Sequence, residues 1–130
     1  MAGLIVIALI LTIIMSWHFM TEGSIAGCGG GSPCEQVLSS RWSNIGGILP
    51  VSGLAAGVYL AMLIAVFFIG PSSETPVRSM SWGVMLILAG AIAGSATWFM
   101  VLQKWIVGDF CPWCIATHTT GLLLAALITQ

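Results

Sequence analysis

Four long apolar stretches alternate with short polar segments along the chain. They cover residues 3–20, 48–70, 81–103 and 111–129. A helix of about 20 residues crosses a hydrocarbon core of about 30 Å. In lipid, a helix is the open structure that satisfies its own backbone hydrogen bonds. The pattern therefore predicts an all-α integral membrane protein, built as a bundle of four transmembrane helices with short loops.

The first polar segment, residues 21–47, is the longest one. It begins with a glycine-rich run between Cys28 and Cys34, which predicts a flexible loop because glycine imposes no preference on φ. The following residues, 35–43, place apolar side chains at helical spacing among polar ones. This predicts a short amphipathic helix at the membrane interface, between the first two spanning helices. Its apolar residues are Val37, Leu38 and Trp42.

The other connections are shorter. Residues 71–80 predict a polar turn, and residues 104–109 a short connection before the last apolar stretch. The second and third stretches each contain two glycines four positions apart, Gly53 with Gly57 and Gly90 with Gly94. Small residues at this spacing allow helices to approach closely in lipid, so we expect these glycines to pack against neighbouring helices of the bundle.

The first apolar stretch also has features of a signal peptide, because residues 25–28 (IAGC) resemble a lipoprotein cleavage box. Two features oppose cleavage. No Lys or Arg precedes the stretch, and the polar pair Thr21 and Glu22 separates it from the box. We therefore retain the stretch as the first spanning helix.

The composition agrees with a membrane protein and excludes one class of partner. Charged residues make up 5% of the chain and hydrophobic residues 58%, against about a quarter and about a half in a soluble domain. The net charge is −1, and the fixed cations are Arg41, Arg78 and Lys104. So few cations form no basic surface, and we expect no nucleic-acid partner.

The run Asp109–Cys114 (DFCPWC) carries the candidate chemistry. If a helix begins here, Cys111 is its N-cap and Pro112 its first residue, a position that tolerates proline. The free N–H groups and the positive dipole end then face the Cys111 sulfur and favour the thiolate, which is the species that exchanges disulfides. The spacing thus indicates redox chemistry. A structural disulfide or half of a four-thiolate metal site remains open.

Counting membrane crossings places both cysteine pairs on one face. Cys28 and Cys34 lie between the first and second helices, and Cys111 between the third and fourth. Two pairs able to form disulfides fit an oxidising compartment. We therefore expect the cysteines on the periplasmic or lumenal side, with a bacterial inner membrane as the expected location and the N and C termini in the cytoplasm.

A flexible cysteine pair facing a pair at a helix end is the arrangement of a thiol relay. Electrons would pass from a soluble dithiol to Cys28 and Cys34, then to Cys111 and Cys114, and finally to a quinone in the lipid. The competing class is a metal-binding or metal-transporting membrane protein that uses all four sulfurs. The apolar stretches lack the Cys, His or carboxylate ligands deep inside that would pass an ion across the membrane.

The same residues carry a resemblance to the vitamin K epoxide reductase family, in its four-helix prokaryotic form. The similar features are the run Cys34–Trp42 (CEQVLSSRW), then Pro50 and Tyr59, then the run Asp109–Cys114. The resemblance implies a four-helix bundle around a quinone, capped by the cysteine loop and its interfacial helix.

Roles for the four cysteines also follow from this resemblance. It implies that Cys114 meets the quinone, that Cys111 exchanges with Cys34, and that Cys28 engages a soluble partner. The implied partner is a periplasmic or lumenal thioredoxin-fold protein that acts in trans, and no metal is implied. The quinone would be ubiquinone, menaquinone or vitamin K.

Other candidate residues each have a functional and a structural interpretation. Ser40 matches a family serine that can hydrogen-bond a quinone oxygen or a thiolate, but a cap or turn contact is equally consistent with its position. Arg41 and Trp42 either help to close the quinone pocket or anchor the chain at the interface. Tyr59 either faces the pocket or bridges helices.

Two positions depart from the animal members of the family. These have tyrosine where His118 stands and, by our alignment, asparagine where Val51 stands. The changes weaken vitamin K epoxide as a substrate, although a vitamin K reductase in the strict sense remains the alternative function. His118 follows Cys114 by one helical turn, so it is placed to supply a proton for quinone reduction. A histidine that is simply buried in the bundle is the structural interpretation.

Overall fold

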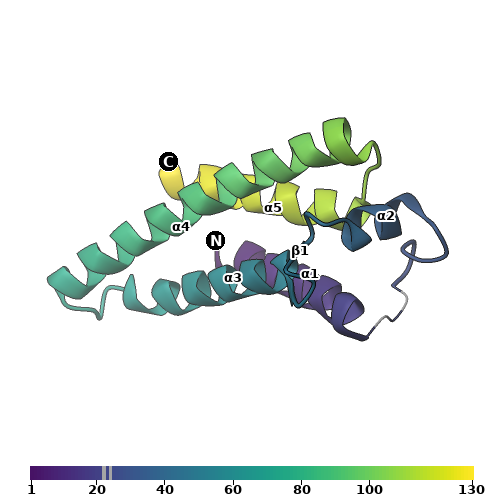
Figure 1. The fold of residues 1–130 in the computed structure, drawn as a ribbon. Coiled ribbons are helices and arrows are strands. Elements are labelled where there is room, and N and C mark those ends of the chain that lie inside the picture. Colours follow the sequence, from purple (N-terminus) through teal and green to yellow (C-terminus); the bar gives the residue numbers. More distant parts are fainter. Residues whose placement is uncertain (22, 24) are drawn as a thin grey trace.

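Four long helices form the molecule, as the sequence predicted. The computed structural model describes residues 1–21, 23 and 25–130. The long helices form a closed ring in which α1 contacts α3 and α5, and α4 contacts the same two helices (Figure 1). They are α1 (Ala2–Thr21), α3 (Val51–Phe68), α4 (Thr75–Leu102) and α5 (Pro112–Thr129).

The outside of the ring is apolar. All four helices are long and hydrophobic enough to span a membrane, and large side chains such as Phe67 and Ile87 are about three-quarters exposed, at 74% and 73%. Water would penalise so much exposed apolar surface, whereas lipid does not. The chain is therefore an integral membrane protein.

The third span is longer than predicted at both ends. The expected polar turn, residues 71–80, ends at Glu74, because α4 already begins at Thr75. At the other end, the predicted connection contains η1 (Gln103–Val107), a π-helical turn that closes at Gly108 with φ 80°. Hydropathy reports where a helix contacts lipid, so it does not reveal turns of helix that extend into the polar layer.

The first connection contains both a helix and a hairpin. The helix α2 (Pro33–Ser39) begins and ends earlier than the predicted range, residues 35–43. After it, β1 (Asn44–Ile45) and β2 (Leu49–Pro50) form an antiparallel hairpin that the sequence analysis missed. Glu22 and Ser24 belong to the predicted loop but lie outside the described residues.

The glycine prediction was largely wrong. A Cβ built on Gly57, Gly90 or Gly94 meets no atom of another element within 4 Å, so these positions do not make close helix contacts, and of the four predicted glycines only Gly53 has such neighbours. The close approach lies instead at Gly121 in α5. A Cβ there would be 2.7 Å from both Tyr59 Oη and Ile92 Cγ2.

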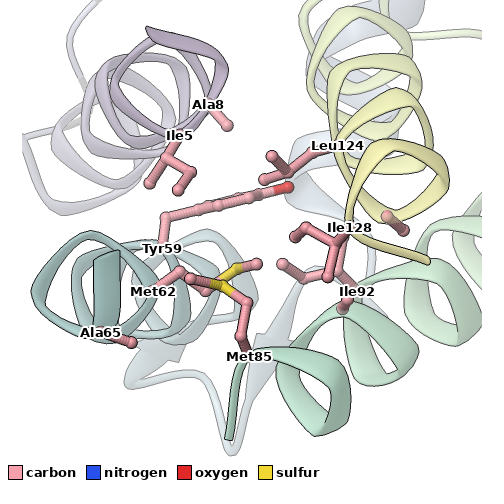
Figure 2. Packing of buried hydrophobic residues seen from close by; sticks show 11 residues of the cluster. Ile5, Ala8, Tyr59, Met62, Ala65, Met85, Ile92, Leu124 and Ile128 are labelled. Carbon is pink, nitrogen blue, oxygen red and sulfur yellow. The ribbon is translucent and has the colours of Figure 1, made fainter. Parts of the chain in front are cut away.

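Two buried clusters divide the interior. Figure 2 shows the larger one, where the Tyr59 ring extends across the space between the helices. The smaller cluster lies at the end that carries α2 and includes all four cysteines, together with Met15 and Val37. The larger cluster consists of Ile5, Ala8, Tyr59, Met62, Ala65, Met85, Ala89, Ile92, Leu124, Ala125 and Ile128.

Candidate active site

The loop pair, Cys28 and Cys34, is joined by a disulfide. Cys34 is held by the start of α2. Here Ser32 is the N-cap and its hydroxyl accepts from the Glu35 N–H, while the Glu35 carboxylate accepts from the Gly31 N–H. These reciprocal contacts form a variant of the capping box and fix the first turn of α2. The disulfide is therefore placed by a defined helix end.

The helix pair, Cys111 and Cys114, is unbonded, and both thiols are buried. Cys111 is the N-cap of α5 and Pro112 its first residue, which confirms the predicted helix start. The Cys111 sulfur accepts from the Cys114 N–H at 3.3 Å. This contact satisfies one of the free N–H groups of the first helical turn.

The surroundings of Cys111 favour its thiolate. Cys111 precedes the membrane-spanning part of α5, and its sulfur lies beside the Cys114 thiol and the backbone N–H groups of Cys114 and Trp113. These neighbours lower the pKa of Cys111 to about 7, although burial acts in the opposite direction. A substantial fraction of Cys111 is then thiolate near neutral pH.

The two pairs meet directly. Cys34 Sγ lies 3.3 Å from Cys111 Sγ, although the two residues are far apart in the sequence. This confirms the prediction that both pairs lie at the same end of the bundle. The loop pair is bonded as a disulfide and the helix pair is not.

The loop is docked on the helix end. Trp113, inside the Cys-x-x-Cys motif, donates from Nε1 to the Ala26 carbonyl at 2.9 Å. Cys28, which the family resemblance assigns to a soluble partner, is 1% exposed, and Cys111 is 0% exposed against 5% for Cys114. Cys28 therefore becomes accessible only after the loop moves.

A cavity of about 330 Å³ lies between the two buried clusters. Cys114 lines it and Cys111 does not, so the helix pair has one sulfur facing the loop pair and one facing the cavity. The volume falls in the range of about 300–1,000 Å³ that is usual for small-molecule sites. Most of its wall is apolar, formed by residues such as Leu54, Ala55, Val58, Ala91, Ala96 and Phe99.

Of the three candidate residues that follow α2, two line the cavity and one does not. Ser40 lines the cavity, but its hydroxyl donates to the Val37 carbonyl at 2.8 Å, as the capping interpretation expects. Trp42 lines the cavity as well. Arg41 is not among the lining residues, and its guanidinium stacks on the Trp42 ring at 5.0 Å from the centroid.

The three remaining candidates all line the cavity. Val51 lies at the first turn of α3, and His118 lies one turn after Cys114 in α5. The His118 ring is stacked parallel to the Phe99 ring, with 5.8 Å between centroids. Tyr59 both lines the cavity and belongs to the larger cluster, so both interpretations of this residue apply.

Several polar residues of the cavity were not predicted from the sequence. Gln103 is the most notable, because its Oε1 accepts from the Cys111 N–H at 3.0 Å. The signal available in the sequence was a glutamine at the end of an apolar stretch, eight residues before Cys111. The other missed polar residues are Thr12, Ser43, Ser52, Ser95 and Thr117.

This geometry agrees with a comparison against protein-family models. The chain matches the model described as "Vitamin K epoxide reductase family" over residues 1–129. The chain belongs to this family. As a vitamin K epoxide reductase family member, it is a membrane oxidoreductase of the kind that uses quinones.

The arrangement of the cysteines does not resemble a metal site. Among the residues that the structure describes, His, Cys, Asp and Glu do not gather in groups of three or more that could hold an ion. Two of the four sulfurs are already joined to each other, whereas a four-thiolate site needs all four as thiolates.

Proposed function

We propose that this family member is a thiol–quinone oxidoreductase that supports disulfide bond formation. Electrons enter from a periplasmic or lumenal thioredoxin-fold protein acting in trans. They pass through Cys28 and Cys34 to Cys111 and Cys114, and then to a quinone in the cavity. The observation that carries this proposal is the position of the helix pair, with Cys111 against Cys34 and Cys114 at the cavity wall.

Each step of this route exchanges one pair of electrons. The reduced partner attacks Cys28, so the partner leaves oxidised and the loop pair becomes a dithiol. The Cys34 thiolate then attacks Cys111 of the oxidised helix pair, forming a Cys34–Cys111 disulfide and releasing Cys114. Cys28 resolves this disulfide and restores the Cys28–Cys34 bond. The helix pair closes again as it gives two electrons to the quinone, which also takes up two protons.

The cavity wall favours a quinone over vitamin K epoxide as the substrate. Val51 and His118 occupy positions where the animal members have asparagine and tyrosine. Valine has no side-chain hydrogen bond to offer an epoxide or a ketone. A flat, largely apolar quinone ring needs fewer fixed polar contacts and fits the apolar wall.

The experiment that tests this function uses the purified protein in detergent with dithiothreitol as reductant. We expect reduction of coenzyme Q1 or menadione, little or no reduction of vitamin K epoxide, and co-purification of a quinone extractable into organic solvent. Preferential reduction of the epoxide would support the vitamin K reductase alternative. Stoichiometric zinc without quinone reduction would contradict the proposal.

His118 provides a prediction about the proton supply. His118→Phe is expected to slow quinone reduction about tenfold to a hundredfold, because an imidazole at the cavity wall can donate or relay a proton. Phenylalanine keeps the stacking on Phe99. The measurement is stopped-flow quinone reduction, with Cys34–Cys111 exchange followed separately and expected to be unchanged. If His118→Phe reduced the quinone as fast as the unmodified protein at every pH tested, His118 would have no part in the mechanism.

A second prediction concerns sidedness. Cys28 lies at the end of the bundle that carries α2, whereas Ser73 lies in the turn between α3 and α4 at the other end (Figure 1). A membrane-impermeant maleimide added outside intact cells is expected to label Cys28 after reduction. It is expected to spare Ser73→Cys in a variant whose four native cysteines are serine. Labelling of Ser73→Cys without labelling of Cys28 would show that the orientation is the opposite of the proposed one.

A further inference from the structure

Gln103 connects the helix pair to the cavity through a single side-chain amide. It is the first residue of η1 and is 3% exposed. Its Oε1 accepts the Cys111 N–H at 3.0 Å, and the same side chain lines the cavity. An uncharged amide buried at this junction is costly unless both its ends find partners.

The nitrogen end of the amide is uncommitted. Since Oε1 must be the atom that meets an N–H donor, Nε2 is the other atom of the group. Nε2 donates no hydrogen bond within the described part of the chain. In that part, one fully buried side-chain nitrogen or oxygen atom lacks a hydrogen-bond partner, and this atom is His18 Nδ1. Because Nε2 of Gln103 also has no partner there, it is not fully buried and retains accessible surface. The space that Gln103 borders is the cavity.

The backbone around Gln103 fixes this orientation. The Gln103 carbonyl accepts the Gly108 N–H at 2.9 Å, which closes the π-helical turn. Gly108 adopts φ 80°, a conformation that glycine reaches without strain. π-Helical turns are frequent at functional sites because they redirect side chains. Here the turn places Gln103 beside Cys111.

Most of the cavity's hydroxyl groups have no proton left for a ligand. Each hydroxyl carries one donor hydrogen, and these side chains already donate to backbone carbonyls. The occupied hydroxyls are Thr12, Ser40, Ser43, Ser95 and Thr117. Among the donors that remain in the described part of the chain, Gln103 is the one bonded to the backbone of the helix pair, and the two hydrogens of its amide have no partner there.

We propose that Gln103 binds the quinone, with Nε2 donating to a quinone carbonyl oxygen while Oε1 holds the Cys111 N–H. The inference rests on the proposed function. Quinone oxygens only accept hydrogen bonds, and negative charge develops on them during reduction, so a donor fixed in advance assists both binding and electron transfer. The amide also orients the ring beside Cys114, which lines the same wall.

The test compares two substitutions that separate the ends of the amide. Gln103→Glu keeps an oxygen for the Cys111 N–H and, when the carboxyl is ionised, removes the donor, whereas Gln103→Leu removes both. The assays are run over a range of pH, because a buried carboxyl that stays protonated can still donate a hydrogen bond. Gln36→Glu, on the exposed face of α2 and outside the cavity, introduces the same charge at the same end of the bundle. Each variant is assayed for dithiothreitol-driven reduction of coenzyme Q1 and menadione. Binding of both quinones is measured by quenching of tryptophan fluorescence.

We expect Gln103→Glu to raise KM and Kd for both quinones about threefold to tenfold, the range of one lost hydrogen bond. Formation of the Cys34–Cys111 disulfide needs no quinone and is measured with Cys28 and Cys114 both replaced by serine. In that background, Gln103→Glu should form it as readily as a chain that keeps Gln103. Gln103→Leu should weaken both quinone binding and disulfide formation, and Gln36→Glu should change neither.

The outcomes separate this inference from the function on which it rests. If the unmodified protein reduces neither quinone, the proposed function fails. If it reduces them and Gln103→Glu leaves KM and Kd unchanged, the inference is overturned and Gln103 only positions Cys111. A Gln103→Glu variant that loses disulfide formation and quinone binding together also overturns it, since the amide would then act through Cys111 alone.

Discussion

Simultaneous Cys28→Ser and Cys114→Ser substitutions are expected to convert most of the protein to a form with a Cys34–Cys111 disulfide. The two remaining sulfurs are 3.3 Å apart in the native arrangement, and neither has its resolving partner. A disulfide that forms between them can then be attacked by no other cysteine of the chain. Non-reducing peptide mapping after mild oxidation measures the product.

The matched control retains the other two cysteines. Cys34→Ser with Cys111→Ser leaves Cys28 and Cys114, which the proposed route does not join, and should yield little internal disulfide. In cells, Cys34→Ser alone should accumulate a mixed disulfide between Cys28 and the soluble partner. Two free thiols in the Cys28→Ser, Cys114→Ser variant under oxidising conditions would show that the loop pair does not exchange with Cys111.

The second large effect concerns the acidity of Cys111. The neighbouring Cys114 thiol is the main cause of its lowered pKa. Cys114→Ala is therefore expected to raise the pKa of Cys111 from about 7 toward its ordinary value of 9.0. Since the thiolate is the form present above the pKa, its fraction at pH 7 should fall from about one half to about one hundredth. Ultraviolet thiolate absorbance, titrated with the loop pair oxidised, measures this change.

Cys114→Ser serves as the control for the acidity prediction. A serine hydroxyl can still donate to the Cys111 sulfur, so its titration should stay closer to that of the unmodified protein. Equal midpoints for Cys114→Ala and the unmodified protein would mean that the backbone N–H groups alone set the acidity of Cys111. Loss of the absorbance change in Cys111→Ser assigns the titration to this residue.

The sequence predicted the elements that contact lipid, because the apolar stretches are long and strongly hydrophobic. It also predicted the start of α5, where Cys111 and Pro112 have specific positional preferences. The sequence did not predict which residues make close contacts between helices, because tertiary packing determines them. The glycine pairs of α3 and α4 have the spacing of a packing motif, yet Gly121 of α5, which has no such partner, makes the close contact with Tyr59.

The candidate site was predictable to a similar extent. The four cysteines are recognisable by their spacing, and the roles proposed for them come from the family resemblance. The burial of Cys28 was not predictable, because it depends on a hydrogen bond between Trp113 and Ala26 across two distant segments. Gln103 was missed because the π-helical turn that directs it into the site leaves no clear periodicity in an apolar stretch.

A single anaerobic turnover tests whether electrons leave the protein through Cys114 to a quinone. The chain has four cysteines, which form two pairs, and each pair stores two electrons. Fully reduced protein mixed with excess coenzyme Q1 should therefore form two hydroquinones per chain, and the Cys114→Ser variant should form almost none. A Cys114→Ser variant that reduces the quinone as completely as the unmodified protein would contradict the account.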